Sequence, residues 1–279
     1  MAPRQPLKLL LLHGYTQSGP LFHIKSRALI KHITKAFPLH EVSAIYPTGP
    51  FQLNPTDIPG FDPSNPPLDP DDIPSIFAWY RRADAADPPL YVGLEAGLEA
   101  VAKTIKEEGP FDGVIGFSQG AAMAGMVAAL LDGNDSKRKE AFEKFATSPA
   151  AMEYPRAFAD DTLRKIQPPL KFAVCYSGFR APGPRYRGFY EDPPIRTPVL
   201  HVLGSLDTVV DEGRSRSLVE ACVGDPEKEG NVVWHPGGHF VPAQRPYLDA
   251  VVVFVRRCLG GGVVGGKGEE DVNDMDVPF

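Results

Sequence analysis

Residues 111–131 read FDGVIGFSQGAAMAGMVAALL, and this stretch decides the fold. It begins with a short apolar run typical of a buried strand and ends with small apolar residues typical of a buried helix. Between the two lies GFSQG, a G-x-S-x-G match in which a strand turns sharply into a helix. Such a turn brings Gly116 and Gly120 together, where side chains would collide. We therefore expect Ser118 to be strained and exposed beside free helix amides, which favour the negative charge of an acyl-transfer transition state.

Partners for this serine follow downstream in the order that α/β-hydrolases use, which is nucleophile, acid and histidine. A serine hydroxyl is a weak nucleophile and needs a base within hydrogen-bond reach. Residues 204–207, GSLD, follow a late strand and offer Asp207 as the acid. Residues 236–240, PGGHF, follow the last strand and offer His239 on a glycine-rich loop. A bare G-x-S-x-G match can be structural, but the strand, the helix and both partners favour catalysis by Ser118.

Two nearby residues compete for these roles. Asp211 could replace Asp207, but it stands where a helix is expected to begin and is better explained as an N-cap. His235 could replace His239, but it ends a strand and lacks the reach of a glycine-rich loop. The sequence therefore predicts the triad Ser118, Asp207 and His239.

Two backbone N–H groups are expected to stabilise the tetrahedral oxyanion. One belongs to Gln119, the residue after the nucleophile, and the other to Tyr15 in the loop after the first strand. His13 in that loop is expected to be a hydrogen-bonding residue of the oxyanion loop. Residues 76–80, IFAWY, either pin a long loop down or form a wall of the acyl pocket. Four side chains are candidates for the substrate pocket: His13, Trp79, Phe179 and Phe240.

Strands alternate with helices along the chain, which predicts an α/β-hydrolase fold. We expect a mainly parallel, doubly wound sheet with helices on both faces and helical or loop excursions over the site. Besides the strand before Ser118, the expected strands are residues 7–12, 42–46, 170–177, 199–203 and 232–234. Besides the helix after Ser118, the expected helices are residues 21–37, 91–106, 212–223 and 243–258. Ligands of such sheets bind at the carboxyl ends of the strands, where the predicted site residues fall.

A single domain is expected over residues 1–259 of the 279. The 30 prolines are about twice the average share and gather in a Pro-rich excursion over residues 51–90. Residues 132–169 have mixed charge and aromatic residues at helical spacing, and they either form a lid over the site or cap the core. Residues 260–279 are glycine-rich and then acidic, which predicts a disordered tail.

Composition excludes several classes of function. A net charge of −6 gives no reason to expect nucleic acid as a partner. Three scattered cysteines are too few for a disulfide framework or a metal cluster, and we expect neither a metal nor a cofactor. No stretch is long enough to span a membrane, and the apolar residues 7–12 are better explained as a strand than as a signal peptide. These features predict a cytoplasmic protein.

Five segments together resemble the fungal family of serine hydrolases. They are HGY at 13–15, GFSQGA at 116–121, YSGF at 176–179, GSLD at 204–207 and GGH at 237–239. The family includes esterases and thioesterases of polyketide gene clusters, such as the thioesterase of the lovastatin pathway. The resemblance implies hydrolysis of a small-molecule acyl ester or thioester, which includes a polyketide or fatty-acyl chain bound to a carrier protein. A general short-chain carboxylesterase and a non-catalytic hydrolase fold that binds a small molecule are the alternatives.

Overall fold

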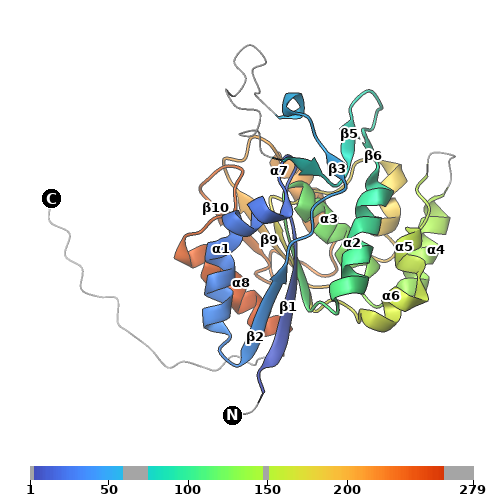
Figure 1. Cartoon of the computed structure of the whole chain (residues 1–279). Helices are drawn as coiled ribbons and strands as arrows, with labels where there is room; N and C mark the ends of the chain where they lie inside the picture. Colours follow the sequence, from blue (N-terminus) through green and yellow to red (C-terminus); the bar gives the residue numbers. More distant parts are fainter. Residues whose placement is uncertain (1–2, 59–74, 147–150, 261–279) are drawn as a thin grey trace.

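A computed structural model describes residues 3–58, 75–146 and 151–260. In this part of the chain, six strands form one parallel sheet in the order β10-β9-β8-β7-β1-β2 (Figure 1). The strands are β1 (Gln5–Leu12), β2 (His40–Ile45), β7 (Gly113–Phe117), β8 (Phe172–Tyr176), β9 (Val199–Gly204) and β10 (Val232–His235). The predicted parallel sheet is confirmed, and the expected strands differ from the observed ones only at their ends.

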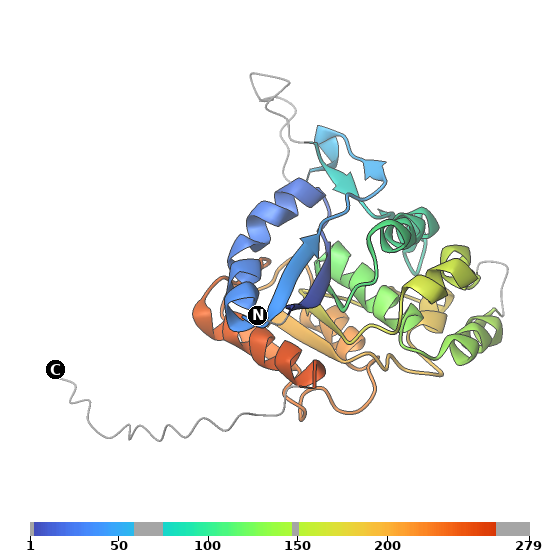
Figure 2. The same ribbon diagram turned by 60° about the horizontal axis from the view of Figure 1, so that its bottom comes forward.

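Helices cover both faces of the sheet, which explains the nearly continuous apolar runs of the strands. Figure 2 shows α1 (Gly19–Ala36) and α8 (Arg245–Cys258) on one side, and α2 (Leu94–Glu108) and α3 (Gln119–Leu130) on the other. Alternate residues of β1 serve the two sides. Leu7, Leu9 and Leu11 pack in one buried cluster with α1 and α8, whereas Leu10 and Leu12 pack in the other with α2 and α3. The sheet is therefore doubly wound, as predicted.

The Pro-rich excursion contains more regular structure than its composition indicates. Strand β3 (Phe51–Gln52) pairs with β4 (Phe77–Ala78), and β5 (Arg81–Ala83) pairs with β6 (Leu90–Val92), both antiparallel. The expected helix over residues 91–106 therefore begins late, because Tyr91 belongs to a strand. Gly93 separates that strand from α2 with a φ of 82°, a left-handed conformation that glycine adopts without strain. Residues 59–74 of the excursion lie outside the described residues.

The described residues of the candidate lid over residues 132–169 include the helices α4 (Asp135–Phe145), α5 (Arg156–Ala159) and α6 (Asp161–Ile166). Helices α5 and α6 pack against α2, and α4 packs against the short helix η3 (Pro184–Phe189). Phe142, Met152 and Phe158 are part of the buried cluster of α2 and α3. These contacts are those of a segment that caps the core, and a lid role stays a prediction. Residues 147–150, and the predicted tail from residue 261 onward, lie outside the described residues.

Candidate active site

The turn between β7 and α3 has the geometry that its glycines require. A Cβ added to Gly116 would lie 2.2 Å from the carbonyl oxygen of Gly120, and one added to Gly120 would lie 2.1 Å from that of Leu12. Ser118 has a φ of 53°, a region that a residue with a side chain rarely adopts. The turn thus holds Ser118 in a strained conformation between the carboxyl end of β7 and the first turn of α3.

Three side chains from three loops meet at this turn. Nε2 of His239 lies 2.8 Å from Oγ of Ser118, and Nδ1 of His239 lies 2.7 Å from Oδ2 of Asp207. Because a carboxylate only accepts, the ring carries its proton on Nδ1, and Nε2 is free to accept the hydroxyl proton of Ser118. The two outer loops are tied together, since the N–H of Leu206 donates to the carbonyl oxygen of Gly237 at 3.0 Å. The structure therefore brings together all three residues of the predicted triad.

Asp207 is held as a carboxylate. Its Oδ1 accepts hydrogen bonds from the backbone N–H groups of Val209 and Val210, each at 2.9 Å. Burial alone would raise the pKa of this carboxyl, but hydrogen bonds, chiefly those from the N–H of Val210 and from His239, outweigh it and lower the pKa below its usual value. The acid thus remains charged and orients the imidazole.

The two competing residues have other roles. Asp211 is the N-cap of α7 (Glu212–Val219), where its Oδ1 accepts from the N–H of Arg214 at 3.0 Å. His235 is buried, and its Nδ1 accepts from the N–H of Gly237 at 3.3 Å. Burial also lowers the pKa of His235. Both arrangements agree with the choice of Asp207 and His239.

The N–H groups of the two predicted oxyanion donors, Gln119 and Tyr15, are both without an acceptor in the described part of the chain. The N–H of Gln119 is the first of α3, so it has no acceptor within the helix. Within the described residues the N–H of Tyr15 also lacks a hydrogen-bond acceptor, and Tyr15 lines the same hollow as Ser118. Both groups are therefore available to a ligand, and their oxyanion role stays a prediction.

The side chain of Gln119 has a second task that the sequence does not reveal. Its Oε1 accepts from the N–H of Trp79, and its Nε2 donates to the carbonyl oxygen of Tyr80, each at 2.8 Å. The indole N–H of Trp79 in turn donates to the carbonyl oxygen of His13 at 2.8 Å. Hydrogen bonds thereby hold the aromatic segment 76–80 against the turn at Ser118 and against the loop after β1, as the pinning interpretation predicts.

Of the four candidate pocket residues, Phe240 alone lines the described hollow at Ser118, with 42% of its surface exposed. His13, Trp79 and Phe179 are buried instead. His13 is a structural hydrogen bonder: its Nε2 accepts from the N–H of Gly49 at 2.9 Å, and its Nδ1 donates to the carbonyl oxygen of Gly14 at 2.8 Å. Burial lowers the pKa of His13 to about 4, so the ring stays neutral.

The hollow at Ser118 has a volume of about 420 Å³. The sequence predicted four of its lining residues, and the ones it did not predict are Thr16, Gln17, Phe22, Lys25, Phe117, Val209 and Val241. Gln17 belongs to the loop after β1, and the position of that loop at the carboxyl edge of the sheet is a signal that could have identified it. Lys25 lies on α1, and the helical pattern of that segment contains no signal that sets it apart.

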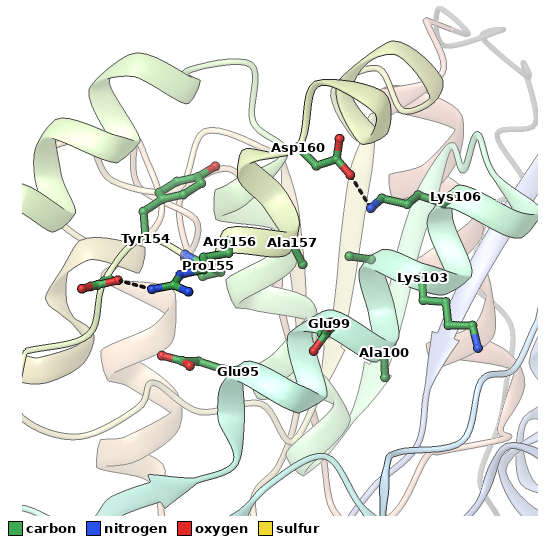
Figure 3. A pocket seen from close by; sticks show the side chains of 12 residues that line it. Glu95, Glu99, Ala100, Lys103, Lys106, Tyr154, Pro155, Arg156, Ala157 and Asp160 are labelled. Atoms are coloured by element: carbon green, nitrogen blue, oxygen red, sulfur yellow. Dashed lines mark hydrogen bonds and ion pairs between the residues drawn. The ribbon is translucent and has the colours of Figure 1, made fainter.

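A larger hollow of about 780 Å³ lies elsewhere, between α2 and residues 153–160 (Figure 3). Two pairs of its charged side chains form ion pairs, Lys106 with Asp160 at 2.5 Å and Arg156 with Glu153 at 3.6 Å. None of the predicted site residues lines it. Across the described ranges, no three His, Cys, Asp or Glu side chains form a group that could hold a metal ion.

Comparison with known proteins agrees with this geometry. Residues 1–251 match the family described as "Serine hydrolase (FSH1)". The chain belongs to this serine hydrolase family. Ser118, Asp207 and His239 all fall within the matched residues.

Among its relatives, this serine hydrolase is 31% identical to "Esterase OVCA2" of Danio rerio, over 90% of the chain and 97% of the relative. It is 33% identical to a Schizosaccharomyces pombe protein called "Dihydrofolate reductase", over 90% of the chain. The chain spans only 47% of that protein and 50% of a second relative from the same yeast, an uncharacterized hydrolase. None of these three relatives points to a polyketide pathway.

A solved structure, that of Zea mays acyl-protein thioesterase 2, has the same fold with a TM-score of 0.53 and 19% identity. The alignment covers 93% of the chain and 96% of the thioesterase. The predicted α/β-hydrolase fold is thus confirmed. In the part of the chain that the structure describes, we find no helix that is both long and apolar enough to cross a membrane.

Proposed function

We propose that this serine hydrolase cleaves a carboxylic ester or thioester through an acyl-enzyme on Ser118. The observation that carries the proposal is the unbroken chain of hydrogen bonds from Asp207 through His239 to Ser118, at 2.7 and 2.8 Å. Its relatives include a protein named as an esterase, which supports the same reaction class.

The reaction follows from the direction of these hydrogen bonds. Oγ of Ser118 attacks the acyl carbon while Nε2 of His239 takes its proton, and Asp207 stabilises the imidazolium that forms. The N–H groups of Gln119 and Tyr15 stabilise the oxyanion. The imidazolium then gives its proton to the departing alcohol or thiol. Water, deprotonated by His239, finally attacks the acyl-enzyme and releases the acid.

For the natural substrate, we propose a fatty-acyl or polyketide thioester, released from a carrier protein in fungal secondary metabolism. This narrower proposal rests on the resemblance of the five motifs to the fungal family. A cytoplasmic location belongs to the same proposal. A series of p-nitrophenyl esters of increasing acyl chain length tests this proposal beside acyl thioesters. If acetyl esters are the preferred substrates and acyl thioesters are not hydrolysed, the protein is a general short-chain carboxylesterase instead.

The reaction class is tested by labelling with a fluorophosphonate probe, followed by intact mass and peptide mapping. We expect one label on Ser118, and no label after Ser118→Ala. Ser136→Ala changes an exposed serine of α4 and is the matched control that should keep the label. Absence of label on the wild-type chain would identify a non-catalytic binding fold.

The acyl group is tested by incubating the chain with candidate acyl thioesters and measuring its mass. An adduct that appears on the wild-type chain and not on Ser118→Ala names the acyl chain directly. Hydrolysis by Ser118→Ala should fall by about 10⁴-fold or more.

A further inference from the structure

A second hollow at the carboxyl edge of the sheet is lined by arginines that the proposed reaction does not use. Its volume is about 500 Å³, and its walls come from the β5–β6 hairpin, the segment 180–191 and α7. Figure 1 shows the hairpin and α7 at the end of the molecule toward which β1 runs. The basic residues of this hollow, called the arginine pocket below, are Arg82, Arg180, Arg187 and Arg214.

Only part of this positive charge is neutralised within the pocket. Glu191 is shared, because its carboxylate binds Arg180 through Oε1 and Arg187 through Oε2. Glu220 is the second carboxylate in the lining. Since Arg82 pairs with Asp84 outside the lining, three arginines share the hollow with two carboxylates. The excess of positive charge stands out in a chain whose net charge is −6.

Arg214 has no carboxylate partner in the described part of the chain. Its guanidinium lies 4.2 Å from the ring centre of Phe179, stacked where a cation–π contact forms. Such a contact holds the planar group in place. The guanidinium also interacts with the side chain of Tyr91, so only part of its N–H donors are left for other partners. Arg82 pairs at 2.7 Å with Asp84, which is not part of the lining.

Guanidinium groups that line one hollow suit phosphate, because their planar N–H groups match its oxygens in pairs of parallel hydrogen bonds. Ser217 on α7 adds a hydroxyl to the same wall. We propose that the arginine pocket binds a phosphate group, with Arg214 and Arg180 as its principal donors.

In sequence, a residue of the arginine pocket closely follows residues of the candidate active site. Asp207 orients His239, Val209 lines the hollow at Ser118, and Arg214 follows on the first turn of α7. A phosphate here belongs either to the leaving group of a thioester, as in a phosphopantetheine-type thiol, or to a separate ligand. The first source rests on the proposed function, whereas the binding of phosphate does not.

Binding is tested by titration calorimetry with inorganic phosphate and with coenzyme A at low salt. We expect Arg214→Gln to weaken binding about tenfold, as loss of a charge-assisted hydrogen bond does. Glu191→Gln should strengthen binding several-fold, since it releases Arg180 and Arg187 from a competing carboxylate. A variant that fails to fold cannot bind phosphate more tightly. The expected gain in affinity for Glu191→Gln, against the expected loss for Arg214→Gln, therefore cannot be explained by misfolding.

The control is Lys35→Gln, which removes the same charge from an exposed site at the far end of α1. Equal affinities for wild type, Arg214→Gln and Glu191→Gln would overturn the proposal. So would an equal loss in Lys35→Gln, which would show attraction by net charge alone.

Kinetics then distinguish the two sources of phosphate. If the leaving group supplies it, Arg214→Gln should raise KM about tenfold for an acyl-coenzyme A. KM for the acyl thioester of N-acetylcysteamine, which has no phosphate, should not change. If Arg214→Gln leaves the KM for acyl-coenzyme A unchanged but weakens the binding of phosphate, the pocket binds a separate ligand. Failure to hydrolyse any thioester would count against the proposed substrate, while calorimetry would still decide on the pocket.

Discussion

Replacing Asp207 with Asn changes one atom in contact with the imidazole and should remove most of the activity. Oδ1 of Asp207 accepts from Val209 and Val210, and Oδ2 accepts from Nδ1 of His239. Asn has one oxygen and one NH₂ group, so it satisfies only one side. If its oxygen keeps the two backbone donors, its NH₂ faces Nδ1 and forces that atom to accept. The ring proton then moves to Nε2, which can no longer take a proton from Ser118.

The opposite orientation of the amide is less stable. It would place NH₂ against the N–H groups of Val209 and Val210, leaving two donors unpaired at about 1–3 kcal/mol each. We therefore expect the inactive tautomer and a loss of about 10⁴-fold in kcat, equivalent to about 5.4 kcal/mol of transition-state stabilisation. The assay is steady-state hydrolysis of p-nitrophenyl butyrate, with circular dichroism to show that the fold is intact.

Asp211→Asn is the matched control for this change. Asn and Asp are about equally good N-caps, so the hydrogen bond to the N–H of Arg214 should survive and kcat should stay near that of the wild type. Asp207→Asn with more than a tenth of wild-type kcat would refute the tautomer argument. A larger loss in Asp211→Asn than in Asp207→Asn would move the acid to the other aspartate.

Two further predictions concern stability. Gln119→Ala leaves the buried N–H of Trp79 and the carbonyl of Tyr80 unpaired, so the free energy of unfolding in urea should fall by about 2–5 kcal/mol; a loss below 1 kcal/mol would contradict the role of this side chain as a clamp. Burial lowers the pKa of His13 to about 4 and that of His201 to about 3, so the unfolded chain binds protons between pH 6.5 and 4 that the folded chain does not. The free energy of unfolding should therefore decrease as the pH falls from 8 to 5, by about 2 kcal/mol for each imidazole. Urea unfolding of wild type and His201→Gln measures this, and an equal pH dependence in both would exclude His201 as a source.

The candidate triad could be predicted because each member is marked by its own local sequence. Gly116 and Gly120 are needed by the turn itself, and the glycines before His239 mark a loop at the end of a strand. Parallel strands then bring these loops to one edge of the sheet, whatever the intervening residues do. The parallel sheet and the covering of both its faces followed from the alternation of strands and helices along the chain, whereas the order of the strands in the sheet was not predicted.

The pocket lining could not be predicted in the same way, because it depends on which side chains face outward in irregular segments. Trp79 is a residue type that commonly lines a pocket. Its backbone and indole N–H groups instead donate to Gln119 and to the carbonyl oxygen of His13, and its side chain is fully buried. Lys25 looks like any exposed lysine of an amphipathic helix, yet it lines the hollow at Ser118. Neither the burial of Trp79 nor the exposure of Lys25 to the hollow is marked in the sequence by a periodic pattern or a motif.

Arg138 shows the same limit for electrostatics. It stands in DSKRKEAFEKF, residues 135–145, where every neighbour suggests a solvated helix face, but its side chain is fully buried. Its guanidinium pairs with the buried Asp132 at 2.9 Å and donates to the carbonyl oxygens of Phe189 and Pro193 at 3.0 and 2.6 Å. A buried charge is costly unless it is paired and hydrogen-bonded, and here a loop more than 50 residues away supplies acceptors for Nη1, although Nε has no partner among the described residues. Arg138 therefore fixes α4 to the segment after η3, which favours the capping role of residues 132–169 over a segment that swings away from the site.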